Sequence, residues 1–419
     1  MELDRAKGTR EIDPKDKLVM NNILSVITKN FELYGFMPLE TPTLQRFDVL
    51  SSKYAGGAEI LKETFKLKDQ GKRQLALRYD LTVPLCLYVG LNPNIKLPFK
   101  RYEIGKVFRD GPVSSERFRE FWQCDVDTVG SYSMMADAEF VNIVFKIFNE
   151  LNMNAVVKIN NRKILDVIMQ YAGVKDSSSA ILSIDKLDKI GIDGVKKELK
   201  EKKLTKSQID KVIGIISING NNKIKLMRLK SILGENDGVK EIEELLVYCN
   251  GKVEFDISLA RGLAYYTGTI FECFLVNDNV KTAVASGGRY DKIIGSFLNN
   301  KQEYPAVGIS FGLDRIAVAL KSGGIIPVKC FIISIGNTKL ESQKLAEELR
   351  SNNISVCLDI IGRGISKNLD YANSLNIPYV IFIGEDELKK GKYKLKNMKT
   401  GKEDMMILNE ILNVLKWNY

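Results

Sequence analysis

The segment KRYEIGKVFRDGPVSSERFREFWQCDVDTVG, residues 100–130, carries the clearest indication of fold in this chain of 419 residues. Two strand-like runs, residues 100–110 and 117–130, flank the loop GPVSSE. Runs of this kind on either side of a short loop predict two antiparallel strands in a hairpin. The runs also contain arginine, glutamine and aspartate residues, which makes the hairpin a candidate for chemistry as well as for structure.

Further elements are predicted on both sides of this hairpin. Apolar residues at helical spacing predict an amphipathic helix over residues 16–34, which Gly35 ends. Residues 64–78, TFKLKDQGKRQLALR, alternate around the turn DQGK and predict a shorter hairpin, and residues 137–150 predict a helix. Strand character returns in three later segments: VEFDISL (253–259), TIFECFLV (269–276) and PAVGISFG (305–312).

Two regions differ from these strands in pattern. Residues 163–248 are helical in pattern and rich in Lys, Ile and Leu, which predicts a helical insertion. The stretch SGGIIP, residues 322–327, predicts a linker. Beyond it, strands alternate with helices, which predicts a small, mostly parallel α/β domain. The sequence thus predicts an α+β domain with an antiparallel sheet over residues 1–326 and an α/β domain over residues 329–419.

Composition excludes several kinds of function. With 45% apolar and 27% charged residues, a charged start and no long apolar stretch, the chain is expected to be a cytosolic protein without a membrane segment. Its six cysteines form no CxxC pair, so no zinc site or disulfide framework is predicted. A net charge of +10 favours a polyanionic partner. The chain has no histidine, which excludes imidazole catalysis and imidazole metal ligands.

Two segments are the most particular in the chain, SLARGLAYYTGTIFE at 258–272 and SGGRYD at 286–291. They resemble the two signatures of histidyl-tRNA synthetases, and the hairpin and SFGLDRI at 310–316 resemble motifs two and three of the class II aminoacyl-tRNA synthetases. Two terminal segments match the family as well: GTREIDP (8–14) and YANSLNIPYVIFIGEDELKKG (371–391). The resemblance covers nearly the whole chain and is weakest in the helical insertion.

This resemblance implies a class II catalytic domain and a C-terminal domain that binds the anticodon. The implied activity is that of a histidine–tRNA ligase, in which ATP and L-histidine give histidyl-adenylate and tRNA(His) then accepts the histidyl group. ATP would be a substrate and Mg²⁺ would be bound with it, with no metal held by the protein alone. Pro42 in ETPTL resembles the motif-one proline, which implies a homodimer.

Three arginines match phosphate-binding positions of the family. Activation builds negative charge on phosphate oxygens, and a planar guanidinium can hold two such oxygens at once. The resemblance assigns catalysis to Arg109 and Arg261, with Arg109 at the α-phosphate of ATP and the reacting carboxylate and Arg261 at carboxylate and phosphate oxygens together. It assigns Arg315 to the γ-phosphate. Each could instead form a surface ion pair, but three arginines at motif positions favour the phosphate role.

Recognition of histidine requires acceptors for its α-ammonium group and for its imidazole N–H. Six residues match the family's histidine pocket: Asp80, Thr82, Gln123, Asp127, Tyr265 and Tyr266. The first three match the α-amino contacts, and the other three match the side-chain pocket. As alternatives, Asp80 and Thr82 could cap a helix that starts before VPLCLYV, and the tyrosines could pack within a strand.

Gly287 and Gly288 in SGGRYD match the family's ATP site, where they would let the backbone approach the adenylate; a simple turn is the alternative. The chain departs from the family pattern at Ala264, where the family commonly has Asp. It also has two candidates, Asp110 and Glu116, for the glutamate that contacts adenine in this class.

Two other functions fit the same fold. One is a histidine-sensing regulatory paralogue of the synthetase that activates ATP phosphoribosyltransferase, and the other is a tRNA-binding module without catalysis. The regulatory paralogues typically lack the C-terminal domain and lose catalytic arginines, whereas this chain keeps residues 329–419 and all three arginines. A tRNA-binding module would be expected to erode the segments RGLAYYTG and SGGRYD, which are almost intact here. The sequence therefore favours the ligase.

Overall fold

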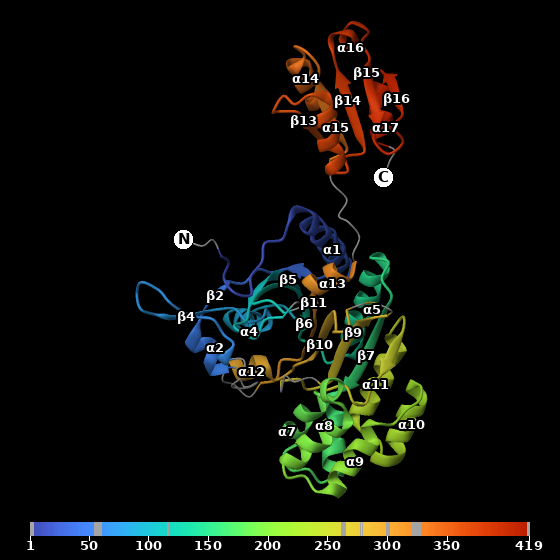
Figure 1. Cartoon of the computed structure of the whole chain (residues 1–419). Helices are drawn as coiled ribbons and strands as arrows, with labels where there is room; N and C mark the ends of the chain where they lie inside the picture. Colours follow the sequence, from blue (N-terminus) through green and yellow to red (C-terminus); the bar gives the residue numbers. More distant parts are fainter. Residues whose placement is uncertain are drawn as a thin grey trace. The chain divides into compact units, whose positions relative to one another are not determined.

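We describe the protein from a computed structural model, which describes residues 4–53, 61–114, 117–260, 265–276, 278, 280–298, 302–320 and 328–416. The chain forms two compact units, one of residues 1–12 and 20–322 and the other of residues 13–19 and 323–419 (Figure 1). Four features singled out in the sequence lie outside the described residues: Arg261, Ala264, Glu116 and the segment 322–327.

The larger unit is built on an eight-stranded sheet with the order β1-β5-β6-β11-β10-β9-β7-β8. Its strands are β1 (Met37–Pro38), β5 (Phe99–Phe108), β6 (Glu120–Val129), β7 (Ala155–Asn161), β8 (Val253–Phe255), β9 (Thr269–Leu275), β10 (Ala285–Arg289) and β11 (Ala306–Gly312). The six strands from β5 to β7 pair antiparallel, and the edge strands β1 and β8 pair parallel. The predicted hairpin of residues 100–130 is β5 and β6, and the predicted antiparallel sheet is confirmed.

Two helices, α1 (Pro14–Leu33) and α5 (Met134–Glu150), cover one face of this sheet. Every second residue of a strand packs against these helices. The ring of Phe31, in α1, lies 5.6 Å from the Tyr102 ring of β5 and 5.8 Å from the Phe311 ring of β11, centre to centre. Phe148 of α5 approaches the same Phe311 ring at 6.3 Å. Because side chains alternate along a strand, the neighbouring residues point to the opposite face, which we call the pocket face.

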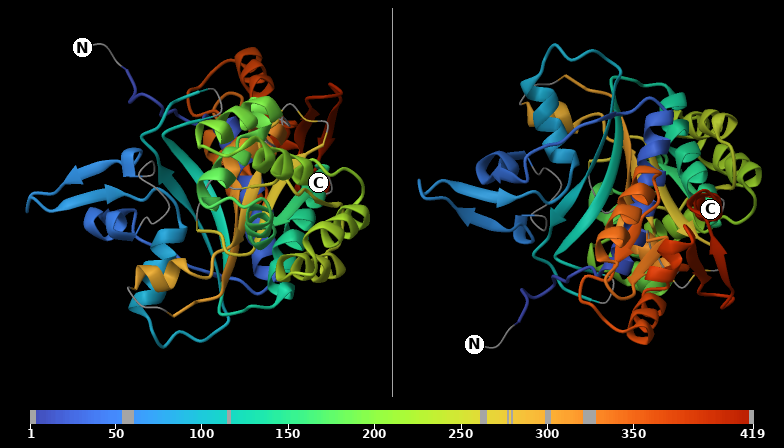
Figure 2. Two further views of the ribbon diagram at one scale, coloured as in Figure 1. Left: turned by 90° about the horizontal axis from the view of Figure 1, so that it is seen from below. Right: turned by 90° about the horizontal axis from the view of Figure 1, so that it is seen from above.

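Helices α4 (Thr82–Leu91) and α12 (Ile293–Phe297) border the pocket face, where they form an apolar cluster with Val129 and Tyr290. A small sheet of the order β2-β4-β3 stands beside them and projects from the main sheet (Figure 2). It consists of β2 (Leu44–Arg46), β3 (Lys66–Lys68) and β4 (Gln74–Leu77), with α2 (Phe47–Lys53) against it. The predicted hairpin of residues 64–78 is therefore confirmed.

The predicted helical insertion is also confirmed, since six helices separate β7 from β8. They are α6 (Arg162–Tyr171), α7 (Ser177–Ile184), α8 (Leu187–Glu201), α9 (Lys206–Ile216), α10 (Asn222–Leu233) and α11 (Asp237–Tyr248). Polar caps start several of these helices; Thr205 and Gln208, for example, form a capping box at α9. The group packs against β7 and α5 at one edge of the sheet (Figures 1 and 2).

One predicted strand is shorter than expected. VEFDISL, residues 253–259, forms only the three-residue strand β8, which ends at Phe255. The Asp256 carboxylate accepts hydrogen bonds from the Ser258 N–H at 3.0 Å and from its hydroxyl at 2.6 Å. This side-chain turn offers the backbone an alternative to the strand and ends it.

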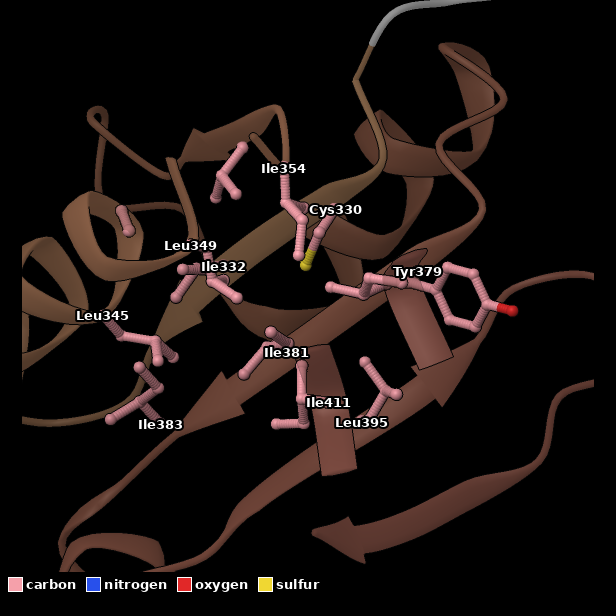
Figure 3. Packing of buried hydrophobic residues seen from close by; sticks show 13 residues of the cluster. Cys330, Ile332, Leu345, Leu349, Ile354, Tyr379, Ile381, Ile383, Leu395 and Ile411 are labelled. Carbon is pink, nitrogen blue, oxygen red and sulfur yellow. The ribbon is translucent and has the colours of Figure 1, made fainter. Parts of the chain in front are cut away.

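The smaller unit has a five-stranded sheet with the order β13-β12-β14-β15-β16. Its elements are β12 (Cys330–Ser334), α14 (Lys339–Ser351), β13 (Val356–Leu358), α15 (Ile365–Ser374), β14 (Tyr379–Ile383), α16 (Glu385–Lys389), β15 (Tyr393–Asn397), β16 (Glu403–Met406) and α17 (Leu408–Lys416). The first three strands in the sheet order are parallel, as predicted, and β15 and β16 add an antiparallel pair. Fully buried isoleucines such as Ile332, Ile381 and Ile383 form its core (Figure 3).

In the described part of the chain, no helix combines the length and the apolar character needed to cross a membrane.

Candidate active site

The pocket face holds a polar cavity of about 430 Å³. It brings together all ten of the predicted site residues that the structure describes: Asp80, Thr82, Arg109, Gln123, Asp127, Tyr265, Tyr266, Gly287, Gly288 and Arg315. Arg261, the remaining predicted site residue, lies outside the described residues. Residues from distant parts of the sequence therefore converge on one cavity.

Strand register arranges the floor of this cavity. Three rows cross the pocket face, each with one residue from β5, β6 and β11 in that order: Arg101–Asp127–Gly308, Glu103–Asp125–Ser310 and Gly105–Gln123–Gly312. Charged and polar side chains occupy most positions, although the surrounding sheet buries them. Buried charges are unfavourable unless they are paired or used, so this floor is the part of the molecule that most requires a functional explanation.

Asp127 is held from two sides. Arg101, which is fully buried, places Nη2 2.9 Å from Asp127 Oδ2, and the Tyr290 hydroxyl donates a hydrogen bond to Asp127 Oδ1. Burial raises the pKa of Asp127, and the Arg101 charge and the Tyr290 hydrogen bond oppose that rise. The third neighbour must be glycine, because a Cβ on Gly308 would lie only 2.0 Å from Asp127 Oδ1.

A second buried arginine supports the next row. Arg78 places Nη1 2.9 Å from Glu103 Oε1, and it donates a further hydrogen bond to the Thr41 carbonyl at 2.8 Å. Thr41 in turn donates to Glu103 from its N–H at 2.9 Å and from its hydroxyl at 2.7 Å. Glu103 is thus engaged mainly by its own arginine, which leaves Arg101 with Asp127 as its nearest carboxylate.

Asp80 and Thr82 lie at the start of α4. The Asp80 carboxylate accepts a hydrogen bond from the Val83 N–H at 3.0 Å, which confirms that Asp80 caps the helix. Thr82 is the first residue of that helix. Because both residues also line the cavity, capping does not remove them from the substrate pocket.

The two tyrosines lie in the segment before β9, so the strand-packing alternative is wrong. Their ring centres are 4.8 Å apart, and the Tyr265 ring lies 6.2 Å from the Tyr290 ring. Tyr266 is only 7% exposed and lies against Gly288, where a Cβ would come within 2.8 Å of its ring. The tyrosines therefore form an aromatic wall of the cavity.

Gly287 and Gly288 belong to strand β10, so the turn that we considered for them is also wrong. Close packing of strands explains the first glycine, since a Cβ on Gly287 would lie 2.0 Å from the Gly308 carbonyl oxygen. A Cβ on Gly288 would lie 2.5 Å from the Thr269 carbonyl oxygen. Both glycines allow backbone to approach backbone, and their role toward ATP stays a prediction.

Arg109 follows β5 and reaches the cavity between two rings. Its guanidinium carbon lies 4.3 Å from the centre of the Tyr79 ring and 5.0 Å from that of Phe121, and its Nε donates to the Tyr79 carbonyl at 3.2 Å. Within the described residues it forms no ion pair, so the surface-pair alternative does not describe it. Arg315, in the first turn of α13 (Leu313–Leu320), donates to the Ala283 carbonyl at 2.8 Å.

Comparison with known proteins agrees with this geometry. A family model for histidyl-tRNA synthetase matches residues 8–316, and a model for an anticodon binding domain matches residues 329–418. This chain belongs to the histidyl-tRNA synthetase family. Its architecture, a catalytic domain on an antiparallel sheet with a C-terminal anticodon-binding domain, is that of a class II synthetase.

Similar proteins cover its full length. Histidine–tRNA ligase 1 of Bacillus cereus is 44% identical over 432 residues, which cover 100% of this chain and 98% of the relative. The crystal structure of histidyl-tRNA synthetase from Nostoc sp. PCC 7120 has a TM-score of 0.88 and 29% identity, and covers 100% of both chains. A structure from Bacillus halodurans C described as an ATP phosphoribosyltransferase regulatory subunit/histidyl-tRNA synthetase has a TM-score of 0.74 and 23% identity, covers 90% of this chain and 97% of that one, and shares the fold alone.

The synthetase-family segment SGGRYD also contains a structural brace. Arg289 forms an ion pair with the buried Asp137 of α5, and its Nη1 lies 3.2 Å from Asp291 Oδ1. Asp291 also accepts hydrogen bonds from the Thr267 hydroxyl at 2.8 Å and from the Ala306 N–H at 3.0 Å. These contacts link the segment to α5, β11 and the end of the signature that contains the tyrosines.

The segment GTREIDP, which matched the family only as a pattern, has a specific contact in the structure. Arg10 places Nη2 2.9 Å from Asp314 Oδ1 of α13, and its guanidinium carbon lies 4.2 Å from the centre of the Phe118 ring. The other oxygen of Asp314 accepts a hydrogen bond from the Trp122 N–H at 3.0 Å. Arg10 thus ties the N-terminal segment to both the β5–β6 hairpin and the helix that carries Arg315.

Sequence reasoning missed several residues that line the cavity: Tyr79, Arg117, Phe118, Phe121, Asp125, Tyr290, Ser310 and Asp314. Asp125 could have been found, since it lies two residues from both Gln123 and Asp127 and must share their face of a strand. Nothing local in the sequence indicates Ser310, which reaches the cavity because β11 pairs with β6.

Proposed function

We propose that this chain is a histidine–tRNA ligase that activates L-histidine with ATP and transfers it to the 3′ end of tRNA(His). Family membership over the full length supports this proposal. The regulatory alternative is not favoured, because the curated relative described above is named a histidine–tRNA ligase and the regulatory-type neighbour described above shares only the fold.

One observation of the site carries the proposal, namely that the cavity has charges of opposite sign at its two ends. Its acidic end contains Asp125 and Asp127, close to the end of β6 that terminates at Val129. Arg109 follows Phe108, which pairs with Glu120 at the opposite end of β6. An ammonium group would bind at the acidic end and phosphates at the basic end, as joining an amino acid to ATP requires.

In the first step, the histidine carboxylate attacks the α-phosphorus of ATP and pyrophosphate leaves. Negative charge builds on the phosphate oxygens, and fixed cations stabilise it without having to reorganise. Arg109 would meet the α-phosphate and the carboxylate, Arg315 would meet the γ-phosphate, and Arg261 would act beside Arg109. The rings of Tyr79 and Phe121 lie against the Arg109 guanidinium, whose planar fork suits paired contacts to oxygens.

Mg²⁺ would enter with ATP and would neutralise part of the phosphate charge. The nearest carboxylates at the basic end are already engaged: Asp314 by Arg10, and Glu63 by Arg117 at 3.0 Å. The donors that remain there are cationic, which fits phosphate oxygens better than a bare metal ion. We therefore expect the phosphates to supply most of the metal's ligands.

In the second step, the terminal ribose hydroxyl of the tRNA attacks the histidyl-adenylate. The chain has no histidine to accept the proton of this hydroxyl, so we infer that a phosphate oxygen of the adenylate accepts it. Replacement of that oxygen by sulfur should strongly slow transfer. If a protein side chain is the base, the same replacement should have little effect.

The remaining parts have supporting roles in this proposal. The smaller unit would bind the anticodon, and the six-helix insertion would lie near the acceptor arm of the tRNA. Exposed apolar side chains near Pro42, such as Met37 and Leu44, favour the homodimer that the motif-one resemblance implies. We expect the protein to work in the cytoplasm, where tRNA is aminoacylated.

The test is ATP–pyrophosphate exchange with the purified protein and each of the twenty amino acids. We expect exchange with histidine alone, followed by charging of tRNA(His). Arg109→Ala should reduce exchange by about 100-fold or more, whereas Arg73→Ala, which removes the pair between the exposed Arg73 and Asp69 in the turn between β3 and β4, should leave it unchanged. Absence of exchange with any amino acid would instead favour the regulatory or tRNA-binding paralogue.

A further inference from the structure

Asp125 is a carboxylate that lines the cavity and whose role the family signatures do not suggest. It is 4% exposed and lies at the centre of the three rows, between Glu103 on β5 and Ser310 on β11. Its neighbours on β6, Gln123 and Asp127, point to the same face. A buried carboxylate in this position requires either a partner in the protein or a partner in the substrate.

The protein does not supply a cation for it. Arg101 lies 2.9 Å from Asp127 and 3.7 Å from Glu103, while Arg78 lies 2.9 Å from Glu103. Within the described residues, Asp125 forms no ion pair. The two buried arginines are thus matched by Asp127 and Glu103, and Asp125 adds a negative charge that neither arginine contacts directly.

Its hydrogen bonds also determine how Gln123 is oriented. The Gln123 amide nitrogen donates to the Ser310 hydroxyl at 2.8 Å and lies 3.4 Å from Asp125 Oδ1. When Asp125 is ionised it can only accept, so in that state the nitrogen of the amide faces it. The Gln123 amide oxygen is then buried, without a hydrogen-bond partner among the described residues, and available to accept from a substrate.

From this arrangement we propose that Asp125 is a further recognition residue for the amino acid. Its carboxylate supplies the negative charge that neutralises the α-ammonium group, and it turns the Gln123 amide so that the oxygen accepts from that group. The inference rests on the proposed function, since it concerns the amino acid that is to be activated.

Burial and the neighbouring negative charges favour the neutral form of this residue. Burial, the largest cause, and the negative charge of Asp127 raise the pKa of Asp125 from 3.8 to about 7, although the Arg101 charge and the Ser310 hydrogen bond oppose the rise. Asp80, near the start of α4, also faces it and adds to the repulsion. Arrival of an ammonium group reverses this balance, so Asp125 releases its proton to solvent as the substrate binds.

Two ligands separate recognition of the ammonium group from recognition of the rest of histidine. L-Histidinol keeps the ammonium and imidazole groups and lacks the carboxylate. 3-(Imidazol-4-yl)propionate keeps the imidazole and carboxylate groups and lacks the ammonium. The imidazole ring titrates at a different pH in each ligand, because the ammonium group lowers its pKa in histidinol and the carboxylate raises it in the propionate, so the protons that the ring exchanges must be counted separately.

The first experiment measures binding of both ligands to wild-type and Asp125→Asn protein. We expect the affinity for histidinol to fall by roughly 10- to 100-fold, as for loss of a charged hydrogen-bond partner, and the affinity for the propionate to change less than about threefold. Asp359→Asn is the matched control, because Asp359 is a hydrogen-bonded carboxylate in the smaller unit. An equal loss for both ligands, or no loss for either, would overturn the proposal.

A second experiment needs no variant and therefore does not depend on the folding of one. Calorimetric titration of the wild-type protein at pH 6.5, in buffers of different ionisation enthalpy, counts the protons released on binding, and the protons that the imidazole ring itself exchanges, followed by NMR of the free and bound ligand, are subtracted. Histidinol should release at least about half a proton more than the propionate does. Equal proton counts would overturn the proposal. If wild-type protein activates histidine in the exchange assay and these tests still fail, only the role of Asp125 is refuted and the proposed function stands.

Discussion

The pocket face of the larger unit and the apolar layer of the smaller unit are both buried surfaces of β-sheets, yet their residues differ completely. The first carries Arg101, Glu103 and Asp125, each at most 4% exposed, and the second carries Ile332 and Ile381, both fully buried (Figure 3). Removal of apolar surface from water is sufficient to explain the isoleucines. It cannot explain buried charges, which lower stability unless they are matched in sign and position. The difference indicates that the buried charges of the pocket face are kept because they bind ligands.

The largest effect should follow from removing Arg101, the fully buried arginine of the pocket face. Arg101→Met leaves Asp127 buried without its arginine, and we expect the free energy of unfolding to fall by about 3–5 kcal/mol and histidine-dependent exchange to be lost. Urea denaturation followed by circular dichroism measures the first. Arg350→Met is the control, because Arg350 is 41% exposed and has as its partners a surface glutamate and the Val356 carbonyl. A fall in the free energy of unfolding of less than about 1 kcal/mol for Arg101→Met would show that the pocket face does not need this arginine.

A somewhat smaller effect is expected from the apolar layer. Ile381→Ala creates a cavity in the smaller unit and should lower the stability of that unit by about 3 kcal/mol, with pyrophosphate exchange retained at low temperature. Ile381→Val, measured beside it, should lower stability by about 1 kcal/mol. If Ile381→Ala abolished pyrophosphate exchange to the same extent as Arg101→Met, the pocket face and the apolar layer would not differ in function as we infer.

Removing the negative charge of Asp125 from the pocket face should raise the free energy of unfolding, whereas the two changes above lower it. The pKa of Asp125 is raised from 3.8 to about 7 in the folded protein, so between these values the folded state binds more protons than the unfolded chain. Stability therefore falls as pH rises through this window. We expect Asp125→Asn to raise the free energy of unfolding at pH 8 by about 1–3 kcal/mol, with a smaller gain at pH 5, in urea denaturation at both pH values. A loss of stability at pH 8 would mean that Asp125 stabilises the fold.

The smallest effect should come from Arg10, which contacts Asp314 and Phe118, two residues that line the cavity. Arg10→Ala removes the ion pair with Asp314 and the contact with Phe118, and the KM for ATP should rise about threefold to tenfold, while the KM for histidine stays unchanged. Steady-state exchange kinetics measure both constants. Arg5→Ala is a close control, since Arg5 is 63% exposed and pairs with Glu11 in the same segment. If both variants behave alike, Arg10 has no special role in positioning α13.

Much of the fold could be predicted because its signals are local. The hairpin of residues 100–130, the helical insertion and the parallel strands of the smaller unit all follow from periodicity over short windows. The hairpin of β15 and β16 was missed because its strands are rich in charged residues and lack clear apolar alternation. Strand β8 was predicted too long because a single aspartate turn ends it.

The residues of the candidate site were only partly predictable from the sequence. Family signatures indicated ten residues that converge on one cavity, but they did not indicate Asp125 or Ser310. They also left the glycines of SGGRYD open to interpretation as a turn, because a short sequence does not reveal which backbone will lie against a glycine. In the structure, the neighbour of Gly287 is the Gly308 carbonyl, 21 residues further along the chain.

By itself, the sequence determined the elements, their order and the family, since each depends on residues that are close together in the chain. Only the tertiary structure decided which side chains share a cavity. Arg101 meets Asp127 because β5 and β6 pair in one register, and Arg10 meets Asp314 across 304 residues. The physical reason is that a shift of one residue in strand pairing would turn every side chain to the other face, and the register depends on the packing of the whole sheet.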